Sequence, residues 1–370
     1  MKKSLIALAV LAASGAAMAQ SSVTIWGVVD AAYSKYDQGG VSKQFMTTSG
    51  NASSQLGFKG TEDLGGGMSA SFWLEAQLNN DSGAGAGYNS AANSLTNNGG
   101  LQFNRRSTID LAGNFGAIRL GRDYTPSFWS HTVFDPFGTL GAGAGSNVTL
   151  ASGHNALTGA RTNNGISYLY NVAANGGSHG LGSKGVYAQV TLALAENLSN
   201  SATGAAGEYS GVRIGYAAGP LNVAAAYSES NSAATAATKY KETNIAGSYD
   251  MGVAQLMAKW GTNDSNVAAT KSTYMTIGAK IPLGNGYIPV SYGNVEVNNA
   301  AKTGASQFAI GYVYNLSKRS ALYTSYSALS NKNGGAYTFL GGNGGGNPGF
   351  SANVAGKNGT GFDAGFRTSF

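Results

Sequence analysis

The feature that most constrains the fold of this chain is an alternation of apolar and polar side chains that recurs along residues 22–370 in segments of about ten residues. In one clear example, Phe72 and Leu74 alternate with Glu75 and Gln77. A period of two is typical of a β-strand with one apolar and one polar face. We count about sixteen such segments, an even number that fits a closed antiparallel barrel with an aqueous channel.

The connections between these segments are of two kinds. Short turns are predicted at Glu62 to Gly67, Asn114 to Gly116, Gly219 to Pro220 and Asp250 to Gly252. Long loops are predicted at Asp81 to Gly100, Tyr124 to Ala160 and Asn331 to Asn358. Short turns at one end and long loops at the other are typical of outer-membrane β-barrels, with the short turns on the periplasmic side.

Composition supports a membrane barrel over a soluble β-protein. Only 11% of the residues are charged, against about 25% in soluble domains. After residue 19 no apolar run reaches the 18 or more residues of a transmembrane helix. A secreted, soluble β-sandwich or solenoid is the main alternative, but no residue-level repeat indicates a solenoid. Because the chain has no Cys, disulfides do not stabilise it.

The N-terminus predicts export. Residues 1–19 contain Lys2 and Lys3, an apolar run and the sequence Ala17-Met18-Ala19, which together fit a secretory signal peptide. Residues 20–370 would then form a single barrel domain. Without the two lysines the chain has 21 basic and 17 acidic residues. The basic residues are scattered singly, which argues against nucleic-acid binding.

Five blocks in order also carry a family resemblance. They are QSSVTIWGVVDAAYS, SSQLGFKGTEDLGGG, NFGAIRLGRDYTPSF, RTNNGISYLYN and the terminal GFRTSF. Together they resemble the general porins of β-proteobacterial outer membranes, over the whole chain. The resemblance implies a homotrimer of sixteen-stranded barrels in outer-membrane lipid and lipopolysaccharide, with the loop at about residues 124–160 folded into each lumen as a constriction.

The resemblance also implies the function and part of the pore wall. It implies passive diffusion of small hydrophilic solutes and ions through a water-filled pore. Arg122 and Arg161 match the family's basic positions at the constriction. The chain has Gln55 where the family often has Arg, and Val28 where the wider superfamily can have Lys. Because basic rings favour anions, we expect a mild anion preference that this shortened set of cations weakens.

The alternation of apolar and polar residues supports a lumen position for only one of the two arginines, Arg122 and Arg161. It puts Arg161 on a polar face, whereas strict alternation from Ile118 and Leu120 puts Arg122 on the apolar face. A bulge at Gly121 would turn Arg122 into the lumen, and we adopt that interpretation.

Other charged and titratable candidates have weaker assignments. Lys59 and Arg213 fall on polar faces but could line any part of a wet lumen. In the constriction loop, which stands opposite the arginines, Asp135 is the only acidic residue. The same loop also contains two titratable histidines, His131 and His154.

No catalytic, metal or cofactor site is predicted. The three histidines, His131, His154 and His179, lack metal-ligand spacing. No G-x-S-x-G occurs, and the G-x-G-x-x-G match at 344–349 has no flanking strand and helix.

Two other functions stay open. A substrate-specific channel for sugars or organic anions is the second choice, because Trp26, Trp73 and Tyr187 face inward by alternation, although they form no continuous track. A barrel-anchored surface adhesin is less favoured, since sixteen strands enclose a water-filled bore that a pure anchor does not need.

Overall fold

The computed structural model describes residues 22–85, 87–89, 94–96, 100–149, 160–172, 184–198, 200, 204–231, 239–266, 271–339 and 354–370. The expected signal peptide at residues 1–19 lies outside these residues, as do His154, His179 and residues 150–159 of the constriction loop.

The described chain is mostly β-strand, with two short helices. The strands are β1 (Ser22–Gln38), β2 (Val41–Thr48), β3 (Gln55–Gly65), β4 (Met68–Asn79), β5 (Ala84–Gly85), β6 (Gly87–Asn89), β7 (Ser94–Thr96), β8 (Arg106–Gly113), β9 (Gly116–Tyr124), β10 (Arg161–Tyr170), β11 (Gly185–Ala193), β12 (Tyr209–Ala218), β13 (Leu221–Asn231), β14 (Lys239–Asp250), β15 (Gln255–Ser265), β16 (Ser272–Leu283), β17 (Gly286–Val297), β18 (Gly304–Asn315), β19 (Ser320–Lys332) and β20 (Gly359–Ser369). The helices are α2 (Pro126–Val133) and α3 (Ser146–Thr149).

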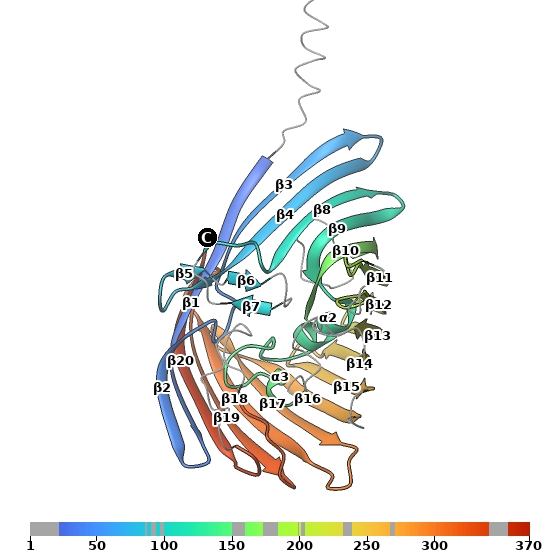
Figure 1. The fold of residues 1–370 in the computed structure, drawn as a ribbon. Helices are drawn as coiled ribbons and strands as arrows, with labels where there is room; N and C mark the ends of the chain where they lie inside the picture. Colours follow the sequence, from blue (N-terminus) through green and yellow to red (C-terminus); the bar gives the residue numbers. More distant parts are fainter. Residues whose placement is uncertain are drawn as a thin grey trace, which may run out of the picture.

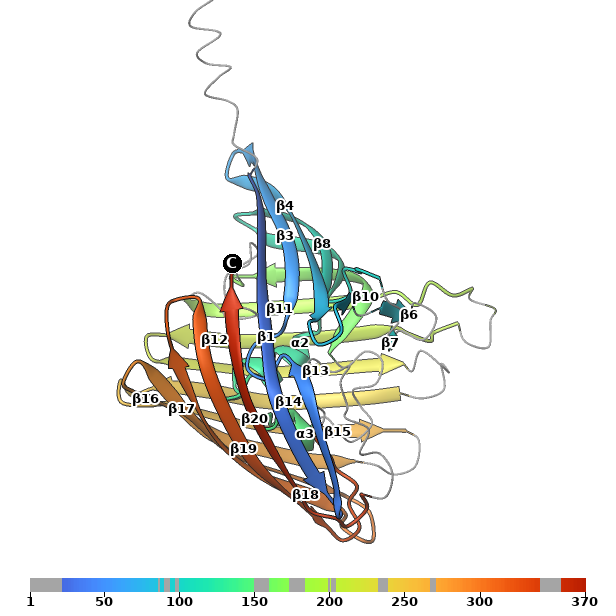
Figure 2. The same ribbon diagram turned by 90° about the vertical axis from the view of Figure 1, so that its left-hand side faces the viewer.

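The strands close into one antiparallel barrel (Figures 1 and 2). β1 pairs with β20 on one side and with both β2 and β3 on the other, so the first and last strands join. β2 and β3 follow one another along β1 and act as a single wall strand, while β5 is a short extension paired to β4. β6 and β7 pair with each other in a separate two-stranded sheet. With β2 and β3 counted as one strand, and β5, β6 and β7 left out, the barrel has the sixteen strands predicted from the alternation. Closure satisfies the backbone hydrogen bonds that an open sheet edge would leave unpaired in hydrocarbon.

The break between β2 and β3 is held by a buried carboxylate. Asp30 of β1 accepts backbone N–H groups from Gly50, Asn51 and Ala52 at 3.1, 3.0 and 2.6 Å, and the hydroxyl of Tyr323 from β19. These bonds replace the ladder pairing that β1 would otherwise make with residues 49–54.

Tight turns gather mainly at the end of the barrel that carries the C-terminus (Figure 1). The β3–β4 turn has three consecutive glycines, Gly65, Gly66 and Gly67, all with positive φ, which side chains with a Cβ adopt only with strain. Two connections depart from the expected asymmetry. Gly39–Gly40 makes a tight turn at the long-loop end, and β10 and β11 are separated by residues 171–184 at the other end.

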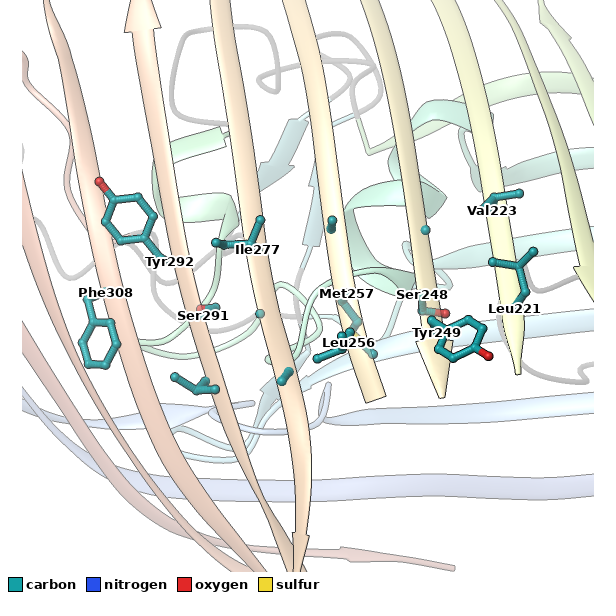
Figure 3. A pocket seen from close by; sticks show the side chains of 15 residues that line it. Leu221, Val223, Ser248, Tyr249, Leu256, Met257, Ile277, Ser291, Tyr292 and Phe308 are labelled. Atoms are coloured by element: carbon teal, nitrogen blue, oxygen red, sulfur yellow. The ribbon is translucent and has the colours of Figure 1, made fainter. Parts of the chain in front are cut away.

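The two faces of the wall are inverted relative to a soluble protein. Apolar side chains point outward, as at Ile277, which is 50% exposed, whereas polar ones such as Asn244 and Ser327 are buried inside. The outer face of β13–β18 carries a hollow of about 660 Å³ (Figure 3), where Gly247, Ala258 and other small residues lie beside larger apolar and aromatic ones. An apolar exterior is suited to hydrocarbon and excludes the soluble sandwich. Among the described residues no helix is long and apolar enough to cross a membrane.

Candidate pore constriction

In the loop between β9 and β10, residues 125–149 run inside the barrel (Figure 1). α2 packs against β11–β14, and α3 packs against β16–β18. Farther along the loop, the backbone N–H of Ala142 donates to Asp363 of β20 at 2.7 Å, and Gln307 and Ser327 donate to loop carbonyls. The loop therefore follows one side of the inner wall, as predicted, and narrows the lumen toward the opposite side.

A cavity of about 430 Å³ lies between this loop and the wall strands. Its charged lining is Glu75 of β4, Arg105 and Arg106 at the start of β8, Asp123 of β9 and Lys280 of β16. Its other lining includes Gln55 and Trp73 from the wall and Trp129, Thr132 and Leu140 from the loop. The cavity is the candidate constriction.

Glu75 and Arg105 form the first charged pair of this site. Arg105 Nε lies 2.5 Å from Glu75 Oε1, and the indole N–H of Trp73 donates to Glu75 Oε2 at 2.9 Å. Arg105 Nη2 donates to the hydroxyl of Tyr124 at 2.9 Å. Arg161 donates to the same hydroxyl, and its guanidinium lies 4.0 Å above the centre of the Tyr124 ring. Two guanidinium groups thus meet at one phenol beside a single carboxylate.

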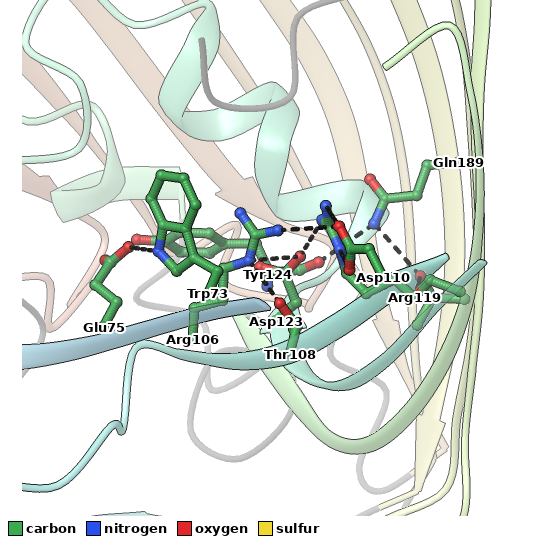
Figure 4. A network of polar contacts seen from close by, with 11 residues as sticks. Trp73, Glu75, Arg106, Thr108, Asp110, Arg119, Asp123, Tyr124 and Gln189 are labelled. Carbon is green, nitrogen blue, oxygen red and sulfur yellow. Dashed lines mark hydrogen bonds and ion pairs between the residues drawn. The ribbon is translucent and has the colours of Figure 1, made fainter. Parts of the chain in front are cut away.

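Arg119 joins two carboxylates a short distance along the wall (Figure 4). It makes a bidentate contact with Asp110 at 2.8 Å on both oxygens and a third contact with Asp123 at 2.5 Å. Arg106 lies 3.7 Å from both Asp110 and Asp123 and 4.7 Å from the centre of the Trp73 ring. The planar fork of Arg suits such multiple contacts and fixes the positions of these charges.

The balance of charge in this region is basic. Arg105, Arg106, Arg119 and Arg161 face the three carboxylates of Glu75, Asp110 and Asp123. Two further cations stand close by. Lys59 lies 5.1 Å from the centre of the Trp73 ring, and Lys280 lines the cavity from the far wall. Fixed charges of one sign in a narrow passage with low-dielectric walls raise the local concentration of counter-ions.

Two of the predicted basic residues reach this site. Arg161 and Lys59 both point into the lumen beside Tyr124 and Trp73, respectively. Arg213 also points inward but is only 1% exposed, because it lies behind the constriction loop between Tyr187 and Phe134.

Arg122 lies on the other face of β9, so the predicted bulge at Gly121 is wrong. β9 pairs with β8 without interruption, and Arg122 stands opposite Ser107, on the side of the exposed Leu120. The register shift lies instead on β10, between Thr162 and Gly165. Arg122 donates to the carbonyl of Asn104 at 2.6 Å and to Asn163 Oδ1 at 2.7 Å. These hydrogen bonds connect the end of β9 to the segment before β8 and to the start of β10.

The two predicted loop residues hold the loop rather than face the cavity. Asp135 is 1% exposed and accepts the backbone N–H groups of Phe137 and Gly145, each at 2.9 Å. His131 is fully buried on α2, where its Nε2 contacts Glu242 of β14. Burial, and then the neighbouring Lys259, lower the pKa of His131 below its ordinary value, so the ring is neutral near pH 7.

Five charged residues of the cavity were not predicted from the sequence: Glu75, Arg105, Arg106, Asp123 and Lys280. Alternation did place Glu75 on a polar face, and the register puts it directly opposite Arg106. The paired arginines at the start of an alternating segment were therefore the available signal. No group of three or more potential metal ligands occurs among the residues the structure describes.

Comparison with known proteins identifies the family. The model of the Gram-negative porins matches residues 5–334. The chain belongs to the Gram-negative porin family. Outer membrane porin protein 32 of Delftia acidovorans is 40% identical over 343 residues, which cover 90% of each chain. An anion-selective porin from Comamonas acidovorans has a TM-score of 0.77 at 32% identity and covers 95% of this chain and 100% of its own.

A more distant structure shares the fold. The trimer form of OmpT from Vibrio cholerae has a TM-score of 0.60 at 14% identity, covering 95% of this chain and 99% of that one. The porin is thus an outer-membrane channel, and the predictions of family, barrel fold and absence of enzymatic activity are confirmed by this membership.

Proposed function

We propose that this porin is a passive diffusion pore for small hydrophilic solutes and ions with a mild preference for anions. The observation that carries the proposal is the excess of cations in the candidate constriction. Four arginines and two lysines stand there with three carboxylates. Basic side chains lining a pore favour anions, and the three carboxylates keep the preference small.

A sugar-specific channel receives less support from the inward aromatic residues. Trp73 is 6% exposed, because Trp26, Lys59 and Arg106 cover it. Tyr124 is covered by Phe128 and by Arg161. These rings hold cations in place and do not present open faces for a sugar to stack on.

The proposed assembly is a homotrimer in outer-membrane lipid and lipopolysaccharide, exported by the signal peptide of residues 1–19. The trimer form of a protein with the same fold supports this assembly. An adhesin needs no passage through its barrel, whereas the cavity beside the loop fits a conducting function.

The test is the reversal potential of single channels in a planar bilayer under a salt gradient. We expect conductance steps in threes and a potential that favours anions. The preference should decline as salt rises, because the screening length falls from about 10 Å at 0.1 M to about 3 Å at 1 M. A selectivity that is unchanged over this range would contradict selection by wall charges, and folded protein without conductance would contradict the pore.

A further inference from the structure

α2 is fixed to the barrel wall by one buried cluster of ionisable groups. His131 Nε2 contacts Glu242 Oε1, and His131 Nδ1 lies 3.1 Å from Lys259 Nζ. The hydroxyl of Tyr274 donates to Glu242 at 2.9 Å. All four side chains are at most 2% exposed. They come from the loop and from three adjacent strands, β14, β15 and β16.

The partners fix the tautomer of His131. A carboxylate only accepts hydrogen bonds, so Nε2 carries the hydrogen that faces Glu242. An ammonium group only donates, so Nδ1 is the unprotonated nitrogen that faces Lys259. A neutral imidazole therefore satisfies both partners at once.

A second proton on the ring would remove this match. Nδ1–H and the ammonium group of Lys259 would then be two donors and two positive charges facing each other across 3.1 Å. The attraction of Glu242 would remain, but the cluster would hold an extra buried charge. Its new N–H would face the ammonium group of Lys259 at 3.1 Å, nearer than the Thr149 hydroxyl, which lies 3.5 Å from Nδ1. Protonation thus weakens the attachment of α2.

We propose that His131, Glu242 and Lys259 are positioning residues that set the width of the pore, and that proton uptake by His131 releases the constriction loop from the wall. The inference rests on the proposed diffusion function of this pore.

The direction of the change follows from the placement of α2. One face of α2 packs against strands β11–β14 of the wall. On the opposite side, Trp129, Thr132 and Val133 line the cavity of about 430 Å³. A helix that leaves the wall moves into this cavity. Acid should therefore narrow the passage and lower the conductance.

The pKa of His131 agrees with this sign. Burial and Lys259 lower it below the ordinary value of about 6.5. A histidine with a lowered pKa binds fewer protons when the loop is attached than when it is released, so attachment is favoured above that range and lost as pH falls.

Other charged and titratable groups surround this cluster. They are Tyr187 of β11, Tyr209 and Arg213 of β12, Lys280 of β16 and Asp135 of the loop, while β13 contributes the uncharged Ser228. Carboxylates also titrate in acid, so the test must keep them all and change only the histidine or its cationic neighbour.

The experiment measures single-channel conductance of the full-length porin between about pH 7.5 and about pH 4.5, a range that brackets the ordinary pKa of histidine. We expect the wild-type conductance to fall about twofold with increased current noise, since a moving constriction sets the current. His131→Gln keeps a donor and an acceptor but does not titrate, so the ratio of its acid to neutral conductance should stay near one.

Lys259→Gln provides an independent variant if His131→Gln does not assemble. Its amide oxygen can accept the new N–H of the imidazolium, and its NH₂ can donate to the neutral ring, so we expect its acid step to be lost as well. His154→Gln removes another histidine of the same loop, as placed by the sequence, and should keep the wild-type acid step.

Three results would overturn the inference: a wild-type conductance that does not change with pH, an acid step retained in both His131→Gln and Lys259→Gln, or a step lost in His154→Gln. The reversal potential recorded at neutral pH tests the proposed function separately. A channel that favours anions but keeps the same conductance in acid would contradict only the proposed release of the constriction loop by His131, and not the proposed function.

Discussion

Arg105 Nε and Glu75 Oε1 lie 2.5 Å apart in the candidate constriction, and both side chains are buried. The pair places a negative charge directly among the cations that we propose to attract anions. Glu75 also holds the indole of Trp73, so it both positions the wall and limits its positive field.

Glu75→Gln should increase the anion preference. The amide keeps nearly the same shape but removes the negative charge beside Arg105 and Arg161, so the reversal potential should shift further toward anions. Breaking one side of a buried ion pair costs about 3–5 kcal/mol, and the melting temperature should fall as well. Glu62→Gln, at an exposed position near the end of β3, is the control and should change neither quantity. An unchanged potential in Glu75→Gln would argue against wall charge as the filter.

Arg161→Gln and Arg122→Gln should separate the two faces of the wall. Arg161 stacks on Tyr124 beside Glu75, and its loss removes a lumen cation. Arg122 stands on the other face of β9 and bonds to Asn104 and Asn163. The reversal potential should move toward zero in the first variant and stay at the wild-type value in the second. Equal shifts in both would place Arg122 back in the lumen.

The alternation in the sequence was sufficient to predict the barrel and the side of most wall residues. Strand pairing obliges side chains to alternate, so Lys59 and Arg213 could each be placed on the inner face. The alternation that linked Arg161 to Ser167 crosses the register shift on β10, so it does not account for the position of Arg161. The error at Arg122 shows the limit. Gly121 has a φ of 117°, but the extra residue that shifts the register is on β10, and one strand's sequence does not reveal which partner carries a bulge.

Which basic residues reach the constriction depends on contacts between residues that are far apart in the sequence. Arg213 and Arg161 were both predicted to lie on polar faces, yet the constriction loop covers only Arg213 and leaves Arg161 beside Tyr124. The path of that loop is set by contacts with strands more than a hundred residues away, such as that between His131 and Glu242. Neither period nor composition encodes this path.

Asp135→Asn should affect the loop more than the selectivity. The carboxylate accepts N–H groups from Phe137 and Gly145 and is not in the lining of the cavity. Loss of a buried acceptor costs about 1–3 kcal/mol, so we expect noisier currents and a lower melting temperature with little change in reversal potential. Asp81→Asn, on an exposed turn, should behave as wild type. A large shift in reversal potential would instead make Asp135 a charge of the filter, as the sequence suggested.

Trp73→Leu should loosen the cations of the constriction. The indole ring lies under Lys59 at 5.1 Å and under Arg106 at 4.7 Å, and its N–H bonds to Glu75. Cation–π contacts contribute about 0.5–2 kcal/mol each, so their loss leaves both cations with more freedom to move. We expect a larger single-channel conductance, because a smaller side chain widens the passage, together with a weaker anion preference.

Trp260→Leu is the matched control for this variant. Trp260 is 48% exposed on the outer face of β15, so its replacement removes an indole of the same size without touching the lumen. Its conductance and reversal potential should equal those of the wild type. If Trp73→Leu also conducts and selects as the wild type does, the aromatic support has no part in the filter, and the contacts of Arg106 with Asp110 and Asp123 must be enough to hold that cation in place.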